Sequence, residues 1–79
     1  MEINDIHTDI KKFIGDLSES NIKSIHEVGS VKSFTFKTPK LTIFFITTSN
    51  NLTEYLISFD NKGYREDEFV RMLKMKTFW

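Results

Sequence analysis

The residues that could do chemistry are few, and their spacing does not assemble a catalytic site. Asp5, His7 and Asp9 are of the types that bind metals, but side chains two positions apart on a helix do not converge. The chain has no cysteine, so thiolate chemistry and disulfides are excluded. His26 is isolated, no G-x-S-x-G nucleophile pattern occurs, and the single glycine of 61–64 does not make a phosphate loop. We therefore predict a protein that is not an enzyme and that has no catalytic residues, metal or cofactor.

Charge argues against a nucleic-acid partner. The eleven basic residues are balanced by eleven acidic ones, whereas most of the affinity for phosphate backbones comes from a basic surplus. Lys23, Lys32, Lys37 and Lys40 lie near one predicted hairpin and the turn after it. In the register predicted below, Lys23 and Lys32 fall at the margin of the core face and Lys37 falls on the opposite face. These lysines therefore do not predict one continuous basic surface.

Length and hydropathy indicate a single small domain over residues 1–79. A hydrophobic fraction of 39% is enough for a packed core rather than disorder. No apolar run long enough for a membrane span and no signal-peptide pattern occurs, so we predict no membrane contact and a cytoplasmic location. Nine Lys against two Arg, with no Ala or Gln, is typical of an AT-rich genome. This composition points to a low-GC bacterium or its phage as the source, and hence to the bacterial host cell.

The elements that must position these residues are two helices and four strands. Apolar residues at spacings of three and four between Ile3 and Leu17 predict a helix, capped by Asn4 or Asp5 and ended near Gly15. The strands are predicted at 22–28, 31–38, 41–48 and 53–60, with a two-residue turn at 29–30 and a break at 61–63. The second helix starts with acidic residues and has its basic residues later. The fold class is thus α+β, a single α-β-β-β-β-α domain with an antiparallel meander sheet and flanking helices.

One strand, Leu41 to Thr48, is apolar on both faces, which indicates cover on both sides. Either the helices divide between the two faces, or part of one face awaits a partner. We expect both helices on the core face. The parity of the meander places Phe34 opposite Phe45 and Phe36 opposite Ile43. The residues predicted on the core face are Ile25, Phe34, Phe36, Leu41, Ile43, Phe45, Tyr55, Ile57 and Phe59.

Three surface features are candidate partner-binding sites. Phe44, Ile46 and Leu56 form an apolar island among Ser and Thr side chains on the opposite face, as in an interface centre with a polar rim. Cover by the second helix, or ordinary exposure of apolar residues, is the alternative. The run 66–68 offers three carboxylates, Glu66, Asp67 and Glu68, which are equally explained as complementing the helix dipole and extending into water. The aromatic pair at 78–79, Phe78 and Trp79, either anchors a partner or folds back onto the sheet.

Three fragments carry a resemblance to a known family: Met1–Ile6 followed by Ile10-Lys11, then Glu54–Ser58, then Glu66–Phe69. They resemble the first helix, last strand and acidic helix of a small phage-encoded anti-CRISPR protein that inhibits Cas9. The resemblance implies a helix, an antiparallel sheet and further helix, and binding to Cas9 where it reads the DNA motif beside its target. That inhibitor is a strongly acidic DNA mimic, whereas this chain is neutral and has no room for a helix between its last strand and the acidic segment.

We therefore expect a small protein-binding module, encoded by a phage or mobile element, that inhibits a bacterial host protein by steric or competitive block. A CRISPR effector is one candidate partner. The alternatives are a homodimeric structural or accessory protein, in which the islands of two copies bury each other, and a nucleic-acid-binding accessory protein.

Overall fold

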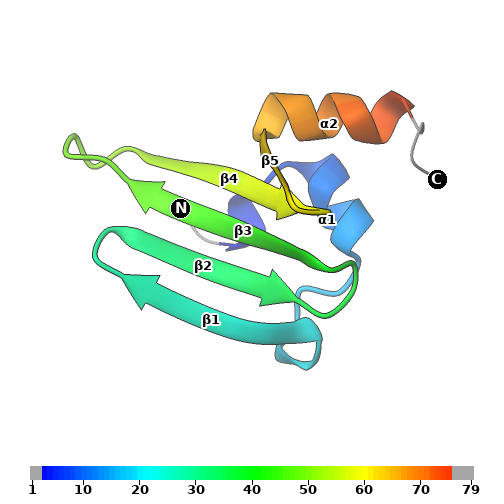
Figure 1. The fold of residues 1–79 in the computed structure, drawn as a ribbon, viewed down its shortest axis with the longest axis horizontal. Helices are drawn as coiled ribbons and strands as arrows, with labels where there is room; N and C mark the ends of the chain where they lie inside the picture. Colours follow the sequence, from blue (N-terminus) through cyan, green and yellow to red (C-terminus); the bar gives the residue numbers. More distant parts are fainter. Residues whose placement is uncertain (1–2, 76–79) are drawn as a thin grey trace.

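The computed structural model describes residues 3–75, which form one antiparallel sheet with short helices. Along the chain lie the 3-10 turn η1 (Ile3–Asp5), α1 (Thr8–Ile14), the 3-10 turn η2 (Glu19–Asn21), β1 (Ile22–Val28), β2 (Val31–Phe36), β3 (Leu41–Thr47), β4 (Thr53–Phe59), β5 (Lys62–Arg65) and α2 (Glu66–Met75). The strands follow the order β1-β2-β3-β4-β5 in the sheet (Figure 1). The predicted α+β class and the meander are confirmed.

The fifth strand corrects the prediction that the chain leaves the sheet after β4. Lys62 pairs with Phe59, and Tyr64 pairs with Ile57. Asp60 and Asn61, between the strands, both have positive φ, at 54° and 63°, as a two-residue hairpin turn requires. Asp and Asn tolerate this conformation better than other non-glycine residues. The turn therefore lies at 60–61, whereas the prediction assigned Asp60 to the strand and placed a break at 61–63.

The first helix is shorter than predicted, and the predicted cap at Asn4 or Asp5 is wrong. α1 begins at Thr8 with His7 as its N-cap, whose Nδ1 accepts a hydrogen bond from the Asp9 amide (3.1 Å). The His7 amide itself donates to the Tyr55 hydroxyl (3.0 Å). This bond to β4 draws the chain out of helical geometry at a point that local spacing does not mark. The predicted end is confirmed, because Gly15 caps the helix with φ 82°.

The register between β2 and β3 differs from the prediction by two residues. Phe34 lies opposite Ile43 and Thr35 opposite Thr42, because β2 ends at Phe36, two residues before the predicted end of that strand, so that the connecting loop occupies 37–40. A shift of two residues keeps every side chain on its predicted face. The predicted register of β1 against β2 is confirmed, with Val28 opposite Val31 and Ile25 opposite Phe34.

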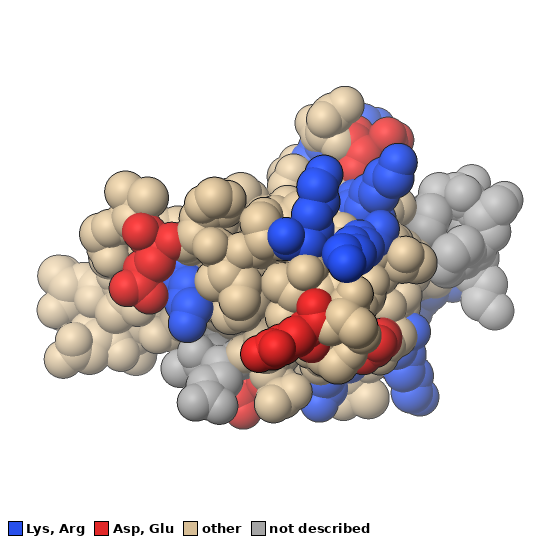
Figure 2. All heavy atoms as spheres, turned by 90° about the horizontal axis from the view of Figure 1, so that it is seen from below, with Lys and Arg blue, Asp and Glu red and all other residues tan. Residues whose placement is uncertain are grey.

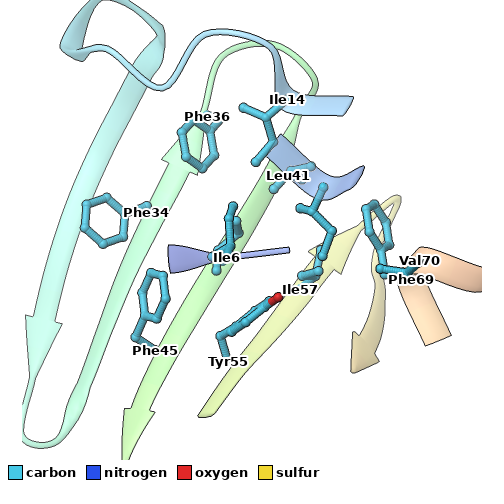
Figure 3. Close-up of a cluster of buried hydrophobic side chains, with 12 residues drawn as sticks. Ile6, Ile14, Phe34, Phe36, Leu41, Phe45, Tyr55, Ile57, Phe69 and Val70 are labelled. Atoms are coloured by element: carbon cyan, nitrogen blue, oxygen red, sulfur yellow. The ribbon is translucent and has the colours of Figure 1, made fainter. Parts of the chain in front are cut away.

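Both helices pack on one face of the sheet, so the core lies between that face and the helices (Figure 3). In Figure 1 the sheet is seen from the other side, with α1 behind it and α2 beside β4 and β5. The strand residues expected in the core are confirmed except for two: Phe59 is only partly buried and Ile25 is exposed. The buried apolar residues are Ile6, Ile10, Ile14, Phe34, Phe36, Leu41, Ile43, Phe45, Tyr55, Ile57, Phe69 and Val70.

Ile25 is the clearest error in the predicted core, since it is 50% exposed. α2 contacts β4, β5 and α1, and the two helices leave the end of the β1–β2 hairpin uncovered (Figure 1). There the core side of the sheet opens into a hollow lined by Glu27, Lys32, Phe34 and Phe45, with Ile3 at its border. Alternation places Ile25 on the correct face, but the short helices do not reach it.

Candidate functional site

The face of the sheet opposite the helices, here called the outer face, is the main candidate for function. The strand register shows which residues of each strand lie on this face. From β1 to β5 its residues are Ser24, His26 and Val28; Val31, Ser33 and Thr35; Thr42, Phe44 and Ile46; Glu54, Leu56 and Ser58; and Gly63 and Arg65. No helix within residues 3–75 packs on this face.

An apolar patch occupies the centre of the outer face. Phe44 lies opposite Leu56 on β4, and Ile46 lies opposite Val31 on β2. Leu56 is 40% exposed, and the other three side chains are half-buried. The structure therefore brings together the predicted island Phe44, Ile46 and Leu56 and adds Val31. We call these four residues the outer patch.

Hydroxyl groups line one side of the outer patch. The Thr35 and Thr42 side chains share a hydrogen bond (Oγ1–Oγ1 3.0 Å), and Ser33 lies opposite both His26 and Phe44. Ser58 lies opposite Thr42. Such groups can donate to or accept from a partner without leaving buried charge behind, as the rim of an interface requires.

Beyond the hydroxyls, three lysines surround a shallow hollow of about 560 Å³, which we call the basic hollow. Lys23, Lys37 and Lys40 line it together with Thr35, Thr42 and Ser58, and Asp60 and Asn61 close its far side. Within residues 3–75 no hydrogen bond or ion pair engages these three ammonium groups. Seen from the β1 edge, with the outer face upward, basic side chains gather over the right-hand half of the molecule (Figure 2).

The basic hollow corrects the prediction that these lysines are divided between the faces. The pairing of β1 with β2 shifts between Ile22 and Ser24, which leaves Lys23 as an extra residue in a β-bulge. A bulge re-aims its side chain, and Lys23 consequently joins Lys37 and Lys40 on the outer face. Lys32 stays on the core side, with its Nζ 5.4 Å from the centre of the Phe34 ring.

A buried asparagine holds the loop that carries Lys37 and Lys40. The Asn21 Nδ2 donates to the carbonyls of Asp16 (2.7 Å) and Thr38 (2.8 Å), and its Oδ1 accepts from the Thr38 amide (3.0 Å). The Lys37 amide donates to the Asn21 carbonyl (2.8 Å). The loop also contains a cis peptide bond between Thr38 and Pro39. Sequence reasoning placed Asn21 in an ordinary loop and missed this role.

Acidic residues lie at the other end of the outer patch. β5 is too short to cover the start of β4, and a groove there is lined by Ile46, Leu56, Glu54, Glu66 and Asp67, with Thr53, Tyr55 and Arg65. The fold thus brings two of the predicted sites, the apolar island and the acidic run, into one groove. Along the strands, the outer face runs from this acidic groove through the outer patch to the basic hollow.

All three residues of the acidic run are exposed, as predicted, but two of the carboxylates also accept hydrogen bonds. Glu66 Oε2 accepts a hydrogen bond from the Tyr55 hydroxyl (2.5 Å). Glu68 Oε1 accepts from the Arg65 amide (3.0 Å), which satisfies a free donor at the start of α2 as in a capping box. Asp67 is the member of the run whose carboxylate has no hydrogen bond or ion pair within the described residues.

Tyr55 joins the N-terminal segment to α2. Its hydroxyl donates to Glu66 and accepts from the His7 amide, although the ring is buried. Burial, and next the hydrogen bond to the Glu66 carboxylate, raise the pKa of the Tyr55 phenol well above its ordinary value. The phenol therefore stays protonated in the folded protein under conditions that ionise it in the unfolded chain.

We expect Tyr55→Phe to lower the free energy of unfolding by about 1–2 kcal/mol at neutral pH, because two partners lose a buried hydroxyl. In the wild type, the unfolded chain releases the phenolic proton above about pH 10 while the folded protein retains it. Wild-type stability therefore declines above that pH by up to about 1.4 kcal/mol per pH unit, and the variant lacks this decline. Urea unfolding near neutral pH and at about pH 11 checks this; a stability difference that does not shrink at the higher pH contradicts it.

The remaining predicted site residues contribute less. The aromatic pair Phe78 and Trp79 lies outside the described residues. His7 Nδ1 is 4.0 Å from Asp9 Oδ2, but this histidine is already used as the cap of α1. Within residues 3–75 no cluster of three or more His, Asp or Glu side chains is arranged to hold a metal ion.

Membrane-spanning potential and similarity to known proteins bear on identity. In the described part of the chain, neither helix has the length and apolar content needed to cross a membrane. No protein-family model, curated protein or solved structure matches this chain.

Proposed function

We propose that this domain is a non-enzymatic protein-binding module whose outer face docks onto a partner protein. One observation carries the proposal: both helices pack on the same side of a five-stranded sheet, and the other side presents a contiguous apolar patch. A monomeric domain of this size gains little by leaving Phe44 and Leu56 at a solvated surface. A partner that covers them removes their apolar area from water.

The outer patch has the anatomy of a binding centre. Burying one such side chain contributes about 1.5–3 kcal/mol, and interfaces concentrate their energy in a few apolar anchors surrounded by groups that exclude water. Phe44 is the anchor, because it lies between Ser33 and Leu56 near the middle of the sheet. The neighbouring hydroxyls and charged groups form the rim.

The charges on the outer face define the chemistry of the partner. Carboxylates of Glu54, Glu66 and Asp67 lie at one end of the outer patch, and the basic hollow lies at the other. A complementary partner surface has an apolar centre that faces the outer patch. Its basic groups face the carboxylates at one end, and its acidic groups face the basic hollow at the other. Such complementarity orients the partner and speeds association more than it adds affinity.

The proposed partner is a bacterial host protein. We propose that the domain is a phage-encoded inhibitor, which blocks this partner by occupying one of the partner's functional surfaces. The resemblance of 54–58 and 66–69 to an anti-CRISPR protein makes a CRISPR effector the first candidate. With no net charge, the domain would act by steric or competitive block rather than by imitating DNA along its whole surface.

The test is capture of a partner from nuclease-treated bacterial lysate by amino-terminally tagged protein, followed by mass spectrometry. We expect the wild type to retain one dominant host protein. Phe44→Ser should weaken binding of the purified partner by at least about 30-fold, the equivalent of about 2 kcal/mol, while circular dichroism shows the fold unchanged. The control is Leu52→Ser, which alters a 64% exposed apolar residue between β3 and β4.

Three outcomes would refute the proposal. Equal binding by the wild type and Phe44→Ser would exclude the outer patch as the binding centre. Unfolding of Phe44→Ser would show that this residue belongs to the core. Equal losses in Phe44→Ser and Leu52→Ser would mean that general surface hydrophobicity, rather than the outer patch, retains the captured protein.

A further inference from the structure

The lining of the basic hollow is rich in hydrogen-bond donors and poor in acceptors. Its three ammonium groups, on Lys23, Lys37 and Lys40, make no hydrogen bond or ion pair with any residue of 3–75. Among the described residues, the one carboxylate in the lining is that of Asp60, which forms no ion pair with them. Each ammonium group has three N–H donors to offer. Such a lining favours an anion.

Hydroxyl groups add donors in a row across the sheet. The strand register places Thr35, Thr42 and Ser58 side by side on β2, β3 and β4, and neighbouring strands lie about 4.8 Å apart. The bond between Thr35 and Thr42 uses the hydrogen of one hydroxyl and leaves that of the other free. The Ser58 hydroxyl is also available, since no described residue bonds to it. We call these three residues the hydroxyl row.

The backbone holds the lysines near one another although their charges repel. Lys37 and Lys40 begin and end the loop between β2 and β3, and the bulge of β1 brings Lys23 to the same hollow. Hydrogen bonds between Asn21 and Thr38 hold this loop in place. Like charges placed opposite each other on neighbouring strands are destabilising. The arrangement therefore gains stability when an anion binds.

The charge and the donors of the basic hollow match a phosphate monoester. Near neutral pH such a group carries a charge of about −1.5 to −2 and has three terminal oxygens that accept hydrogen bonds. A carboxylate carries a single charge on two oxygens, and the phosphate of a diester likewise carries a single charge. Either would leave cations of the hollow without a counter-charge.

A nucleic-acid strand fits the basic hollow less well. Towards the other end of the outer face the lysines give way to the outer patch and then to Glu54, Glu66 and Asp67, so the next phosphates of a strand would approach carboxylates. The aromatic ring in the lining, that of Phe36, is 1% exposed and offers no face on which a base could stack. The hollow is therefore suited to a single phosphate group.

We propose that the basic hollow is a binding site for one phosphate monoester group, held by the three lysines and the hydroxyl row. This inference does not depend on the proposed partner protein, because the same donors hold a free phosphorylated compound or a phosphorylated side chain. It gives a role to the end of the outer face that lies beyond the outer patch.

The first test is a titration of the full chain with ethyl phosphate at constant ionic strength, followed by the amide resonances of residues 23 and 37–40. We expect shifts that saturate, and at least about fivefold weaker binding of diethyl phosphate and of acetate, which lack the second charge. Lys37→Gln should weaken binding of ethyl phosphate by at least about fivefold, because it removes a charge-assisted hydrogen bond. The control, Lys32→Gln, removes the same charge from the core side of the sheet and should bind like the wild type.

A second pair of variants tests the hydroxyl row. Ser58→Ala should weaken binding of ethyl phosphate about threefold, the loss expected for a neutral hydrogen bond. Ser33→Ala, on the outer face but outside the basic hollow, should leave this affinity unchanged. Both variants should keep the circular dichroism spectrum of the wild type.

A phosphoserine peptide with phenylalanine two positions away distinguishes the two sources of the phosphate. Thr42 and Phe44 lie on the same face of β3, and alternate residues of an extended chain are about 7 Å apart, so the ring of the peptide can reach the outer patch. Binding about tenfold tighter than that of ethyl phosphate, with the gain abolished in Phe44→Ser, would assign the site to a phosphorylated side chain of a partner. Equal affinity would assign it to a free phosphorylated compound.

Shifts that rise without saturating would overturn the proposed site, as would equal affinities for ethyl phosphate and acetate. Equal losses in Lys37→Gln and Lys32→Gln would overturn it too, because only the overall charge would then attract phosphate. Unchanged binding by Ser58→Ala would exclude the hydroxyl row from the site.

Discussion

Phe69→Ala is expected to be largely unfolded at 25 °C. Phe69 is fully buried at the start of α2, with ring centroids 5.6 Å from Phe13, 5.9 Å from Phe59 and 5.5 Å from Tyr64. Truncating such a residue to alanine costs about 3–5 kcal/mol, because transfer free energy is lost and a cavity remains. A domain of 79 residues has a total stability of only about 5 kcal/mol. The loss is therefore comparable to the whole free energy of unfolding.

Urea unfolding followed by circular dichroism measures this effect directly. The matched control is Met75→Ala at the other end of α2, where the side chain is 60% exposed, and its stability should stay within about 0.5 kcal/mol of the wild type. A loss below about 1 kcal/mol for Phe69→Ala would contradict the position of α2 on the core face. The outer face would then not be the only open face of the sheet among the described residues.

Asn21→Leu is expected to destabilise the domain by about 3 kcal/mol. The side chain makes three hydrogen bonds that join the end of α1 to the loop between β2 and β3. Leucine has a similar size but makes none of them, and the Thr38 amide and carbonyl lose their partner. A hydrogen bond contributes about 0.5–1.5 kcal/mol, and the variant loses three of them.

Local readouts distinguish this mechanism from a general loss of packing. In Asn21→Leu, amide hydrogen exchange should accelerate first at Lys37 and Thr38, while the β3–β4 pairing stays protected. Asn50→Leu, at an exposed position, is the control and should leave both exchange and stability near wild type. A stability loss of less than about 1 kcal/mol, or uniform acceleration of exchange, would show that Asn21 does not hold the loop.

Much of this fold could be predicted from the sequence because its signals are local. Alternation along β2, β3 and β4 assigns each side chain to a face, and the assignment of Phe44, Ile46 and Leu56 to the face away from the core is confirmed. The two-residue turn at Gly29 set the β1–β2 register correctly, because such a turn leaves one pairing. An error of two residues in the β2–β3 register was harmless, since side-chain direction repeats every two residues.

The errors arose where a distant contact decides the local geometry. The N-terminal helix starts late because the His7 amide bonds to Tyr55, 48 positions away in the sequence. Asn21 is buried because its amide meets Thr38, 17 positions away. No periodicity or propensity within a short window contains either bond.

By itself, the sequence determined the α+β class, the faces of the central strands and the apolar island, because these follow from side-chain alternation and hydrophobic spacing along single elements. Only the tertiary structure decided how that island is surrounded. The bulge at Lys23 and the loop held by Asn21 gather three lysines at one end, and the short β5 brings Glu66 and Asp67 to the other. Helices too short to reach β1 leave Ile25 exposed at an open edge. The physical reason is that charge clusters and uncovered edges depend on distances between elements, which the order of residues along the chain does not specify.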